Sequence, residues 1–207
     1  MKRLQPAFLL GILIAWGSSA MAVEEAKYTV VEKDGSFEIR DYAPYVLAEV
    51  TVKAGLEDAG NIAFNRLFGY ITGKNRTRAK IAMTAPVSQE PASRKIAMTA
   101  PVSQEPATGG GWSVSFTMPA SCTMENLPTP EDAGVTLRPV PARRMAAVRY
   151  SGRWTEKGYL LHKAELTVWI AKKGLAVAGD AVWARYNPPF TPWFLRRNEI
   201  LIPISGG

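Results

Sequence analysis

Few side chains in this sequence can carry out nucleophilic or metal chemistry. It contains one histidine, His162, and one cysteine, Cys122, so a histidine-based catalytic triad or dyad would have to be built on these two. Neither C-x-x-C nor H-E-x-x-H spacing occurs, which removes the common zinc patterns. With one cysteine the chain cannot form an internal disulfide, and its stability must come from packing.

Three acidic residues are the remaining candidates for acid–base chemistry: Glu38, Asp41 and Glu199. Two carboxyl groups held close together raise the pKa of one of them, as a general acid requires. Buried ion pairs with neighbouring arginines explain the same acids without catalysis, and the candidates are Arg40, Arg196 and Arg197. The sequence therefore predicts no enzyme, and a carboxylate-based site in a cleft between the two halves of the chain is the enzymatic alternative.

The overall charge is mildly basic. Lys and Arg number 25 against 18 Asp and Glu, giving a formal net charge of +7. The basic residues are scattered among acids and do not form a patch, so the sequence does not indicate a nucleic-acid partner. Such a surface suits anionic ligands.

Residues 1–22 have the pattern of a secretory signal peptide. Lys2 and Arg3 precede a short apolar run over residues 7–16, and Ala20-Met21-Ala22 is a small-x-small cleavage site. A membrane anchor is the alternative, but the run is shorter than the roughly 20 apolar residues that span a bilayer. We expect a periplasmic or secreted protein without a stable membrane anchor after cleavage, with residues 23–207 forming one domain.

Hydrophobic periodicity predicts two similar halves. Residues 28–31 are rich in strand-forming side chains, and apolar residues alternate along 37–40, 46–52 and 112–118, as in strands with one buried face. Residues 135–140, 145–150, 181–186 and 199–204 read as strands of the second half. Apolar residues at helical spacing predict helices over 64–71, ended by Gly73, and over 155–173. The expected fold is α+β, with two pseudo-symmetric strand–strand–helix–strand–strand units forming a curved, mainly antiparallel sheet against which both helices pack.

Three motifs in fixed order carry a family resemblance. Residues 36–42 read SFEIRDY, residues 69–87 read GYITGKNRTRAKIAMTAPV, and YNPP at 186–189 is followed by RRNEI at 196–200. This set resembles the SOUL family, also called the haem-binding-protein family, from about Tyr28 to Ile204. The resemblance implies the same pseudo-twofold fold, shared with sensor domains of bacterial regulators, and haem bound in a hydrophobic cleft beside the first helix.

A tandem duplication interrupts the second motif. Residues 80–92 read KIAMTAPVSQEPA, and residues 95–107 repeat all thirteen letters. Family members carry one such segment a few residues after the Gly-x-Asn turn, and copy one (80–92) has that spacing. We therefore predict that 81–87 holds the core strand and that copy two (95–107) lies in an extended hairpin or loop, within an insertion over 88–111. The two copies have equal strand propensity, so either can occupy the core.

The resemblance implies a haem site built on the first helix. Its apolar face would form the wall, and nearby cations would pair with the propionates; the predicted binding residues are Phe64, Arg66, Leu67, Phe68, Ile71, Lys74 and Arg76. Plain core packing is the alternative for the apolar residues, and a solvated turn is the alternative for the basic ones.

The sequence does not single out one residue as the iron ligand. Some SOUL proteins use a histidine next to the E-I-R strand motif, and here that position is Asp41. His162 is a candidate axial ligand, and an ordinary helix residue at a partly buried or solvent-exposed face is the favoured alternative. Met83, Met98, Tyr42, Tyr45 and Tyr70 are further candidates, so we assign no metal ligand.

Together these observations predict an exported, monomeric protein that binds haem or another tetrapyrrole reversibly and buffers or carries it. An envelope interaction protein that keeps the fold without a haem site is the second hypothesis. Exposed aromatic surface at the first helix would favour haem binding, whereas a sealed core would favour the interaction protein.

The leader gives a direct test. Cleavage after Ala22 predicts a mature chain that starts at Val23, because the residues at 20 and 22 are both small. Intact-mass spectrometry of the protein from envelope fractions should show that terminus. An unprocessed Met1 terminus in those fractions would contradict the prediction.

Overall fold

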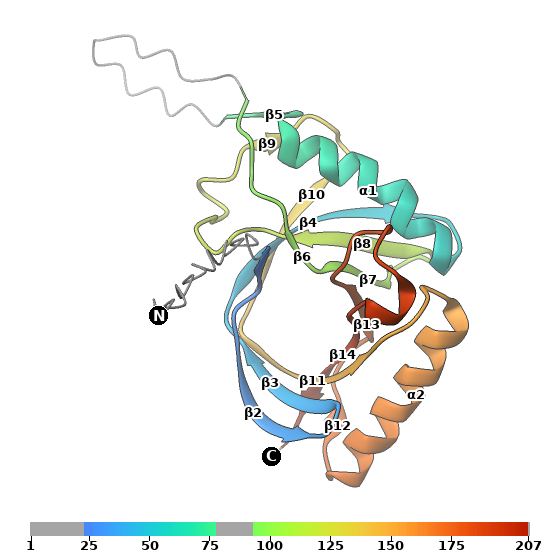
Figure 1. Cartoon of the computed structure of the whole chain (residues 1–207). Coiled ribbons are helices and arrows are strands. Elements are labelled where there is room, and N and C mark those ends of the chain that lie inside the picture. Colours follow the sequence, from blue (N-terminus) through green and yellow to red (C-terminus); the bar gives the residue numbers. More distant parts are fainter. Residues whose placement is uncertain (1–22, 78–92, 207) are drawn as a thin grey trace, which may run out of the picture.

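The computed structural model describes residues 23–77 and 93–206. One ten-stranded sheet dominates them, in the order β10-β4-β8-β7-β13-β14-β11-β3-β2, with β12 paired to β14 (Figure 1). Every pairing within it is antiparallel. Its strands are β2 (Tyr28–Asp34), β3 (Phe37–Tyr42), β4 (Tyr45–Val52), β7 (Val102–Pro106), β8 (Trp112–Thr117), β10 (Thr136–Val140), β11 (Arg143–Tyr150), β12 (Ala176–Val177), β13 (Val182–Arg185) and β14 (Asn198–Ser205).

Two short ribbons and two helices complete the fold. The parallel pair β1 (Glu24–Glu25) and β6 (Thr99–Ala100) joins the N-terminal segment to copy two, and β5 (Asn75–Arg76) pairs with β9 (Thr129–Pro130). The helices are α1 (Leu56–Thr72) and α2 (Glu156–Lys172), and a 3-10 turn, η1, covers Trp193–Leu195. The predicted α+β class is confirmed. Among the described residues no helix is long and apolar enough to span a bilayer.

Turn and cap residues fix where these elements begin and end. The β2–β3 hairpin turns at Gly35, whose φ of 59° lies in the left-handed region that favours glycine. The predicted C-cap of the first helix is confirmed, because Gly73 has a φ of 126° and ends α1. At the start of α2 the Thr155 hydroxyl accepts a hydrogen bond from the Gly158 amide at 3.2 Å.

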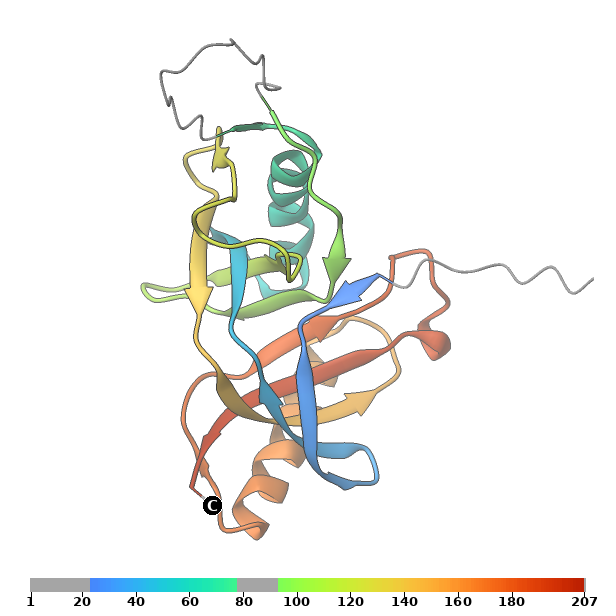
Figure 2. The same ribbon diagram turned by 90° about the vertical axis from the view of Figure 1, so that its left-hand side faces the viewer.

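The sheet curls, and both helices lie on its convex face (Figures 1 and 2). Side chains that alternate along each strand therefore form two different layers. Under α2 the layer is apolar and comprises Ile39, Ala146, Val148, Trp183, Ile200 and Ile202. Under α1 it comprises Val46, Ala48, Val50, Val114 and Phe116. The concave face mixes apolar residues such as Met145 and Leu201 with charged and hydroxyl groups.

Copy two of the duplication forms a central strand of the sheet, so the prediction that it lies in an extended hairpin or loop of an insertion is wrong. It contributes β6 and β7, and β7 pairs with both β8 and β13 in the sheet. Copy two leads directly into a tight turn, in which the Ala107 amide donates to the Gly111 carbonyl at 3.1 Å. Gly109, Gly110 and Gly111 all have positive φ in this turn. Copy one falls within residues 78–92, outside the described part of the chain.

Substitution of the same residue in each copy tests this assignment. Gln104 in β7 is fully buried, and its amide donates to the Leu56 carbonyl at 2.7 Å. Gln104→Ala should lower the free energy of unfolding by about 1–3 kcal/mol, because a buried acceptor loses its partner. Gln89→Ala, the equivalent change in copy one, should leave it unchanged in urea denaturation.

The double variant adds a check on exchange between copies. If copy one replaced the damaged strand, Gln104→Ala alone would be mild and Gln89→Ala/Gln104→Ala would be worse. A loss of stability in Gln89→Ala alone would assign the core strand to copy one.

Candidate functional site

A cleft of about 530 Å³ lies beside the first half of α1. Its volume and its mainly apolar wall are typical of sites for small molecules and cofactors. The wall comes from the N-terminal segment, α1, copy two, Trp154, the end of β13 and the loop that follows β13. It comprises Val23, Gly60, Asn61, Phe64, Asn65, Met98, Thr99, Ala100, Val102, Trp154, Arg185, Tyr186, Asn187, Pro188, Pro189 and Phe190.

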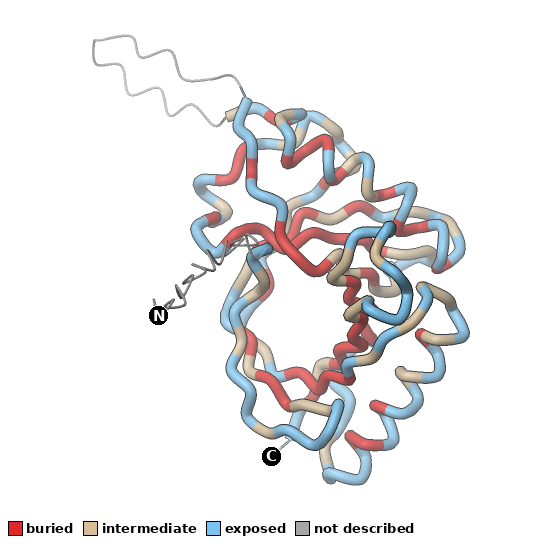
Figure 3. The backbone as a smooth tube through the Cα atoms, viewed as in Figure 1, coloured by how far each residue is buried: buried red, intermediate tan, exposed pale blue. Residues whose placement is uncertain are grey.

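The loop after β13 forms the outer lip of this cleft. Figure 3 shows it as an exposed stretch beside the buried strands, and the Phe190 side chain is 86% exposed. The loop has a defined shape, because Arg196 donates to the carbonyls of Pro189 and Thr191 at 2.6 and 2.8 Å. The lip is thus an apolar surface on an ordered backbone.

The predicted apolar wall residues divide between cleft and core. Phe64 lines the cleft and stacks on Phe68, with ring centroids 5.7 Å apart. Phe68 is 43% exposed and lies outside the cleft lining. Leu67 and Ile71 are buried in the core under α1, where they pack against strand side chains.

The predicted cations do not reach the cleft. Arg66 pairs with Asp132, with Nε 2.7 Å from Oδ2. The Arg66 hydrogen bond, helped by the Gly134 amide, lowers the pKa of Asp132 to about 2. Arg76 lies 3.7 Å from Glu131, and Lys74 follows the end of α1. These residues surround the C-terminal part of α1, whereas the cleft lies beside residues 60–65.

The cation in the cleft is Arg185, which the sequence analysis missed. It is the last residue of β13 and is 7% exposed. Its Nη2 donates to Gln104 Oε1 at 3.2 Å, and its guanidinium lies 5.3 and 5.1 Å from the ring centroids of Trp154 and Trp183. Burial lowers its pKa to about 10. Strand alternation was the available signal, since it places Arg185 on the same face as Trp183.

Of the described candidate iron ligands, one lines the cleft and the others lie elsewhere. Met98 lines the cleft and is 42% exposed. His162 stacks on Tyr150 at 3.8 Å, and its Nδ1 lies 2.8 Å from a Glu165 carboxylate oxygen, away from the cleft lining. Tyr70 is buried and donates to the Pro128 carbonyl. Tyr42 and Tyr45 lie on the concave face. Asp41 pairs with Arg144 at the surface, and Met83 lies outside the described residues.

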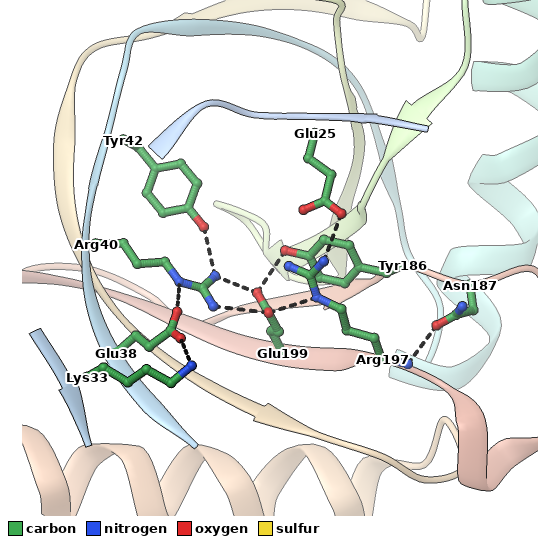
Figure 4. Close-up of polar contacts among 9 residues, drawn as sticks. All are labelled: Glu25, Lys33, Glu38, Arg40, Tyr42, Tyr186, Asn187, Arg197 and Glu199. Carbon is green, nitrogen blue, oxygen red and sulfur yellow. Dashed lines mark hydrogen bonds and ion pairs between the residues drawn. The ribbon is translucent and has the colours of Figure 1, made fainter. Parts of the chain in front are cut away.

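The concave face holds a second polar cluster, centred on Glu199 (Figure 4). The Glu199 side chain has no exposed surface and accepts four hydrogen bonds. Arg40 donates to Oε2 at 2.7 Å and to Oε1 at 3.1 Å. Arg197 Nε donates to Oε1 at 3.0 Å and the Tyr186 hydroxyl to Oε2 at 2.8 Å. The hollow beside this cluster has a volume of only about 30 Å³, about the space of one water molecule.

The electrostatics of this cluster do not suit a general acid. Burial alone raises the pKa of Glu199, but Arg40, Arg197 and Tyr186 outweigh burial and hold that pKa below its usual value. Glu199 is therefore a carboxylate at neutral pH with every acceptor position used. The predicted ion pairs of Glu199 with Arg40 and Arg197 are confirmed, whereas Arg196 binds backbone carbonyls. No group of three potential metal ligands occurs within residues 23–77 and 93–206.

Comparisons with known proteins show which family and which relatives this sequence resembles. The profile of the SOUL heme-binding protein family matches residues 23–203. Heme-binding protein 2 of Mus musculus is 37% identical over 87 residues, which are 39% of this chain and 42% of that protein. The Homo sapiens protein is 37% identical over 83 residues, 37% of this chain and 40% of that protein. The matched stretches thus span about two-fifths of these relatives.

Solved structures share the fold at low identity. The EcmrR C-terminal domain superposes with a TM-score of 0.58 at 9% identity, covering 87% of this chain and 99% of that domain. A hydrolase from Listeria innocua gives a TM-score of 0.53 at 11% identity, covering 84% and 94%. At these identities the likeness concerns the fold alone.

The Glu199 cluster predicts a defined response to substitution and to acid. Glu199→Gln should lower the free energy of unfolding by about 3–5 kcal/mol at pH 7, because two largely buried guanidinium groups lose their counter-charge. The folded-state pKa lies below the unfolded value of 4.5, so this stabilisation is present above pH 4.5 and is lost as the pH falls through the folded-state pKa.

Urea unfolding of wild type and variant between pH 7 and 3 measures this difference. Their stabilities should converge in acid. Glu156→Gln, an exposed acid in the first turn of α2, is the control and should follow wild type throughout. A Glu199→Gln variant as stable as wild type at pH 7 would show that the cluster does not hold the sheet together.

Proposed function

The chain belongs to the SOUL heme-binding protein family, and on that premise we propose that it binds haem non-covalently in the cleft beside α1. The observation that carries the proposal is the cleft itself. It has a volume of about 530 Å³, a mainly apolar wall and one buried cation, Arg185, among its described lining residues. Haem is a flat, mainly apolar ring with two propionates, so it needs both features. The wall offers Phe64, Met98 and Trp154 for contact with the ring.

Apolar contact can hold the ligand without an iron bond. Micromolar binding corresponds to about 8 kcal/mol in all, and burial of apolar surface supplies roughly 25 cal/mol per Å² before the costs of association are subtracted. Met98 is the one thioether on the described cleft wall and can act as a soft ligand or simply as apolar surface. When bound, haem supplies the iron chemistry, and the chain supplies an apolar, partly desolvated surface and the orientation of the ring.

We further propose that the protein works outside the cytoplasm as a monomer. The motive is the leader over residues 1–22, with its basic start, short apolar run and small residues at 20 and 22. Binding without a covalent link is reversible, which suits buffering or carriage of haem. The scattered charges give no reason to expect nucleic acid as a partner.

The two alternative functions have less support. A carboxylate enzyme needs an acid with a raised pKa, and the pKa of Glu199 is lowered. A protein that binds no small ligand would need no cleft. Its fold would be more stable if Phe64, Met98 and Phe190 were covered by other parts of the chain. The open apolar wall therefore favours a small-molecule ligand.

A haemin titration followed by Soret absorbance tests the proposal. Met98→Asp should weaken binding about tenfold or more, because a charge placed on the apolar wall opposes contact with the ring. Met83→Asp is a matched control in the same sequence context, and it should bind like wild type. His162→Ala should also bind like wild type, since His162 lies outside the cleft lining.

Met98→Leu separates the two roles of Met98. An unchanged affinity and Soret band would assign it to the wall, and a shifted band would assign it to iron. Loss of binding in His162→Ala, with Met98→Asp unaffected and both variants folded by circular dichroism, would overturn the cleft site in favour of axial histidine ligation.

A further inference from the structure

The two buried arginines of the described chain differ in their partners. Arg40, 2% exposed, is held by two carboxylates, those of Glu199 and Glu38. Arg185, 7% exposed, has no ion-pair partner among the described residues. Its one hydrogen bond there goes to the neutral amide oxygen of Gln104. A buried charge without a counter-charge is unfavourable, and the two tryptophan rings near Arg185 offset only part of that.

The surroundings of Arg185 are shaped to keep it at the cleft. Gly60 of α1 lies against the guanidinium, and a Cβ on Gly60 would come within 2.0 Å of Nη2 and 2.8 Å of Nη1. Any larger residue at position 60 would displace the arginine. The helix thus approaches β13 closely enough for the guanidinium to form part of the cleft floor, between α1 and Trp154.

One donor of Arg185 is also unpaired. Arg185 Nε is buried and has no hydrogen-bond partner within the described residues. Burial raises the pKa of the nearby Tyr150 hydroxyl and a side-chain contact with Trp183 lowers it, so these two polar groups face each other, and neither residue lines the cleft. Buried polar groups nearly always have partners in folded proteins, so the unpaired Nε of a buried guanidinium on the cleft floor marks a position for a ligand acceptor. Burial also lowers the pKa of Arg185 to about 10, and it remains a cation at neutral pH.

We propose that Arg185 is the anion anchor of the cleft and that it selects apolar ligands carrying a carboxylate. The inference rests on the proposed function in one respect: if haem is the ligand, the carboxylate is a propionate. An arginine binds a carboxylate through two charge-assisted hydrogen bonds, and the apolar walls beside Phe64 and Met98 receive the rest of the molecule. Arg66, Lys74 and Arg76 then have no part in ligand binding.

Matched ligand pairs with and without the negative charge test this role. The first pair is haemin and haemin dimethyl ester, titrated by Soret absorbance. The second pair is independent of haem: the anionic dye 1-anilinonaphthalene-8-sulfonate and the neutral dye N-phenyl-1-naphthylamine, titrated by fluorescence. The variants are Arg185→Met, Arg185→Lys and Arg66→Met, the last being the control in which an arginine outside the cleft is removed.

Wild type should prefer the anionic member of each pair by about 10- to 100-fold, the range for a hydrogen-bonded charge pair. Arg185→Met should lose that preference while keeping its affinity for the neutral member, and Arg185→Lys should keep part of it. Arg66→Met should match wild type. Because Arg185 has no acidic partner, Arg185→Met should be as stable as wild type or more stable in urea unfolding, so the variant is expected to fold.

The outcomes separate this inference from the proposed function. If haemin and its ester bind wild type equally, or if Arg185→Met keeps the preference for the anion, the anchor is wrong while haem binding stands. If no porphyrin binds but the dye preference depends on Arg185, the anchor stands and haem is the wrong ligand. If wild type binds neither haemin nor the anionic dye, both are wrong. A clear loss of stability in Arg185→Met would show that the arginine serves the fold.

Discussion

The buried carboxylate of Glu199 ties together the parts of the chain on which the cleft depends. It lies on β14, accepts hydrogen bonds from Arg40 on β3 and from Tyr186 just after β13, and is paired with Arg197, which immediately precedes β14. These contacts join the first hairpin to the last strand on the concave face. They also fix the end of β13, where the chain changes from strand to loop. Because side chains alternate along a strand, Tyr186 points to Glu199 while Arg185 reaches the opposite face, at the cleft. The position of Arg185 is therefore a consequence of the concave network.

Alternating apolar residues predicted most of the sheet, because each strand buries a helix-facing layer. The predicted runs at 112–118 and 145–150 correspond closely to β8 and β11. The start of α1 was missed for a physical reason. Its first turns bury Ala59, Gly60 and Ala63, and these small residues occur at helical spacing without a strong hydrophobic signal. Small residues there let α1 approach the sheet, which periodicity of large apolar side chains cannot reveal.

The site was predicted less well than the fold, because nearness in sequence was taken for nearness in space. Phe64 lies at the cleft as predicted for the first helix. The predicted cations Arg66, within this helix, and Arg76, after it, instead pair with acids near the C-terminal end of the helix. The cation that reaches the cleft comes from the second half of the chain. Only the pairing of β13 with β7 brings Arg185 beside Gln104 and beneath α1, and no local pattern contains that information. Recognising it required the three-dimensional register of the sheet.

The duplication shows why an error in strand assignment need not change the site. Copy two supplies Met98, Thr99, Ala100 and Val102 to the cleft wall and Gln104 to Arg185. Copy one contains the same residues in the same order. Either copy in the strand position would thus present the same thioether, the same apolar wall and the same amide. Propensity could not choose between them, and the tight glycine turn that follows copy two favours the copy that directly precedes β8. A duplication inside a binding site is tolerated when the repeated unit contains the whole strand, since the side chains that contact the ligand and those that hold the sheet are copied together.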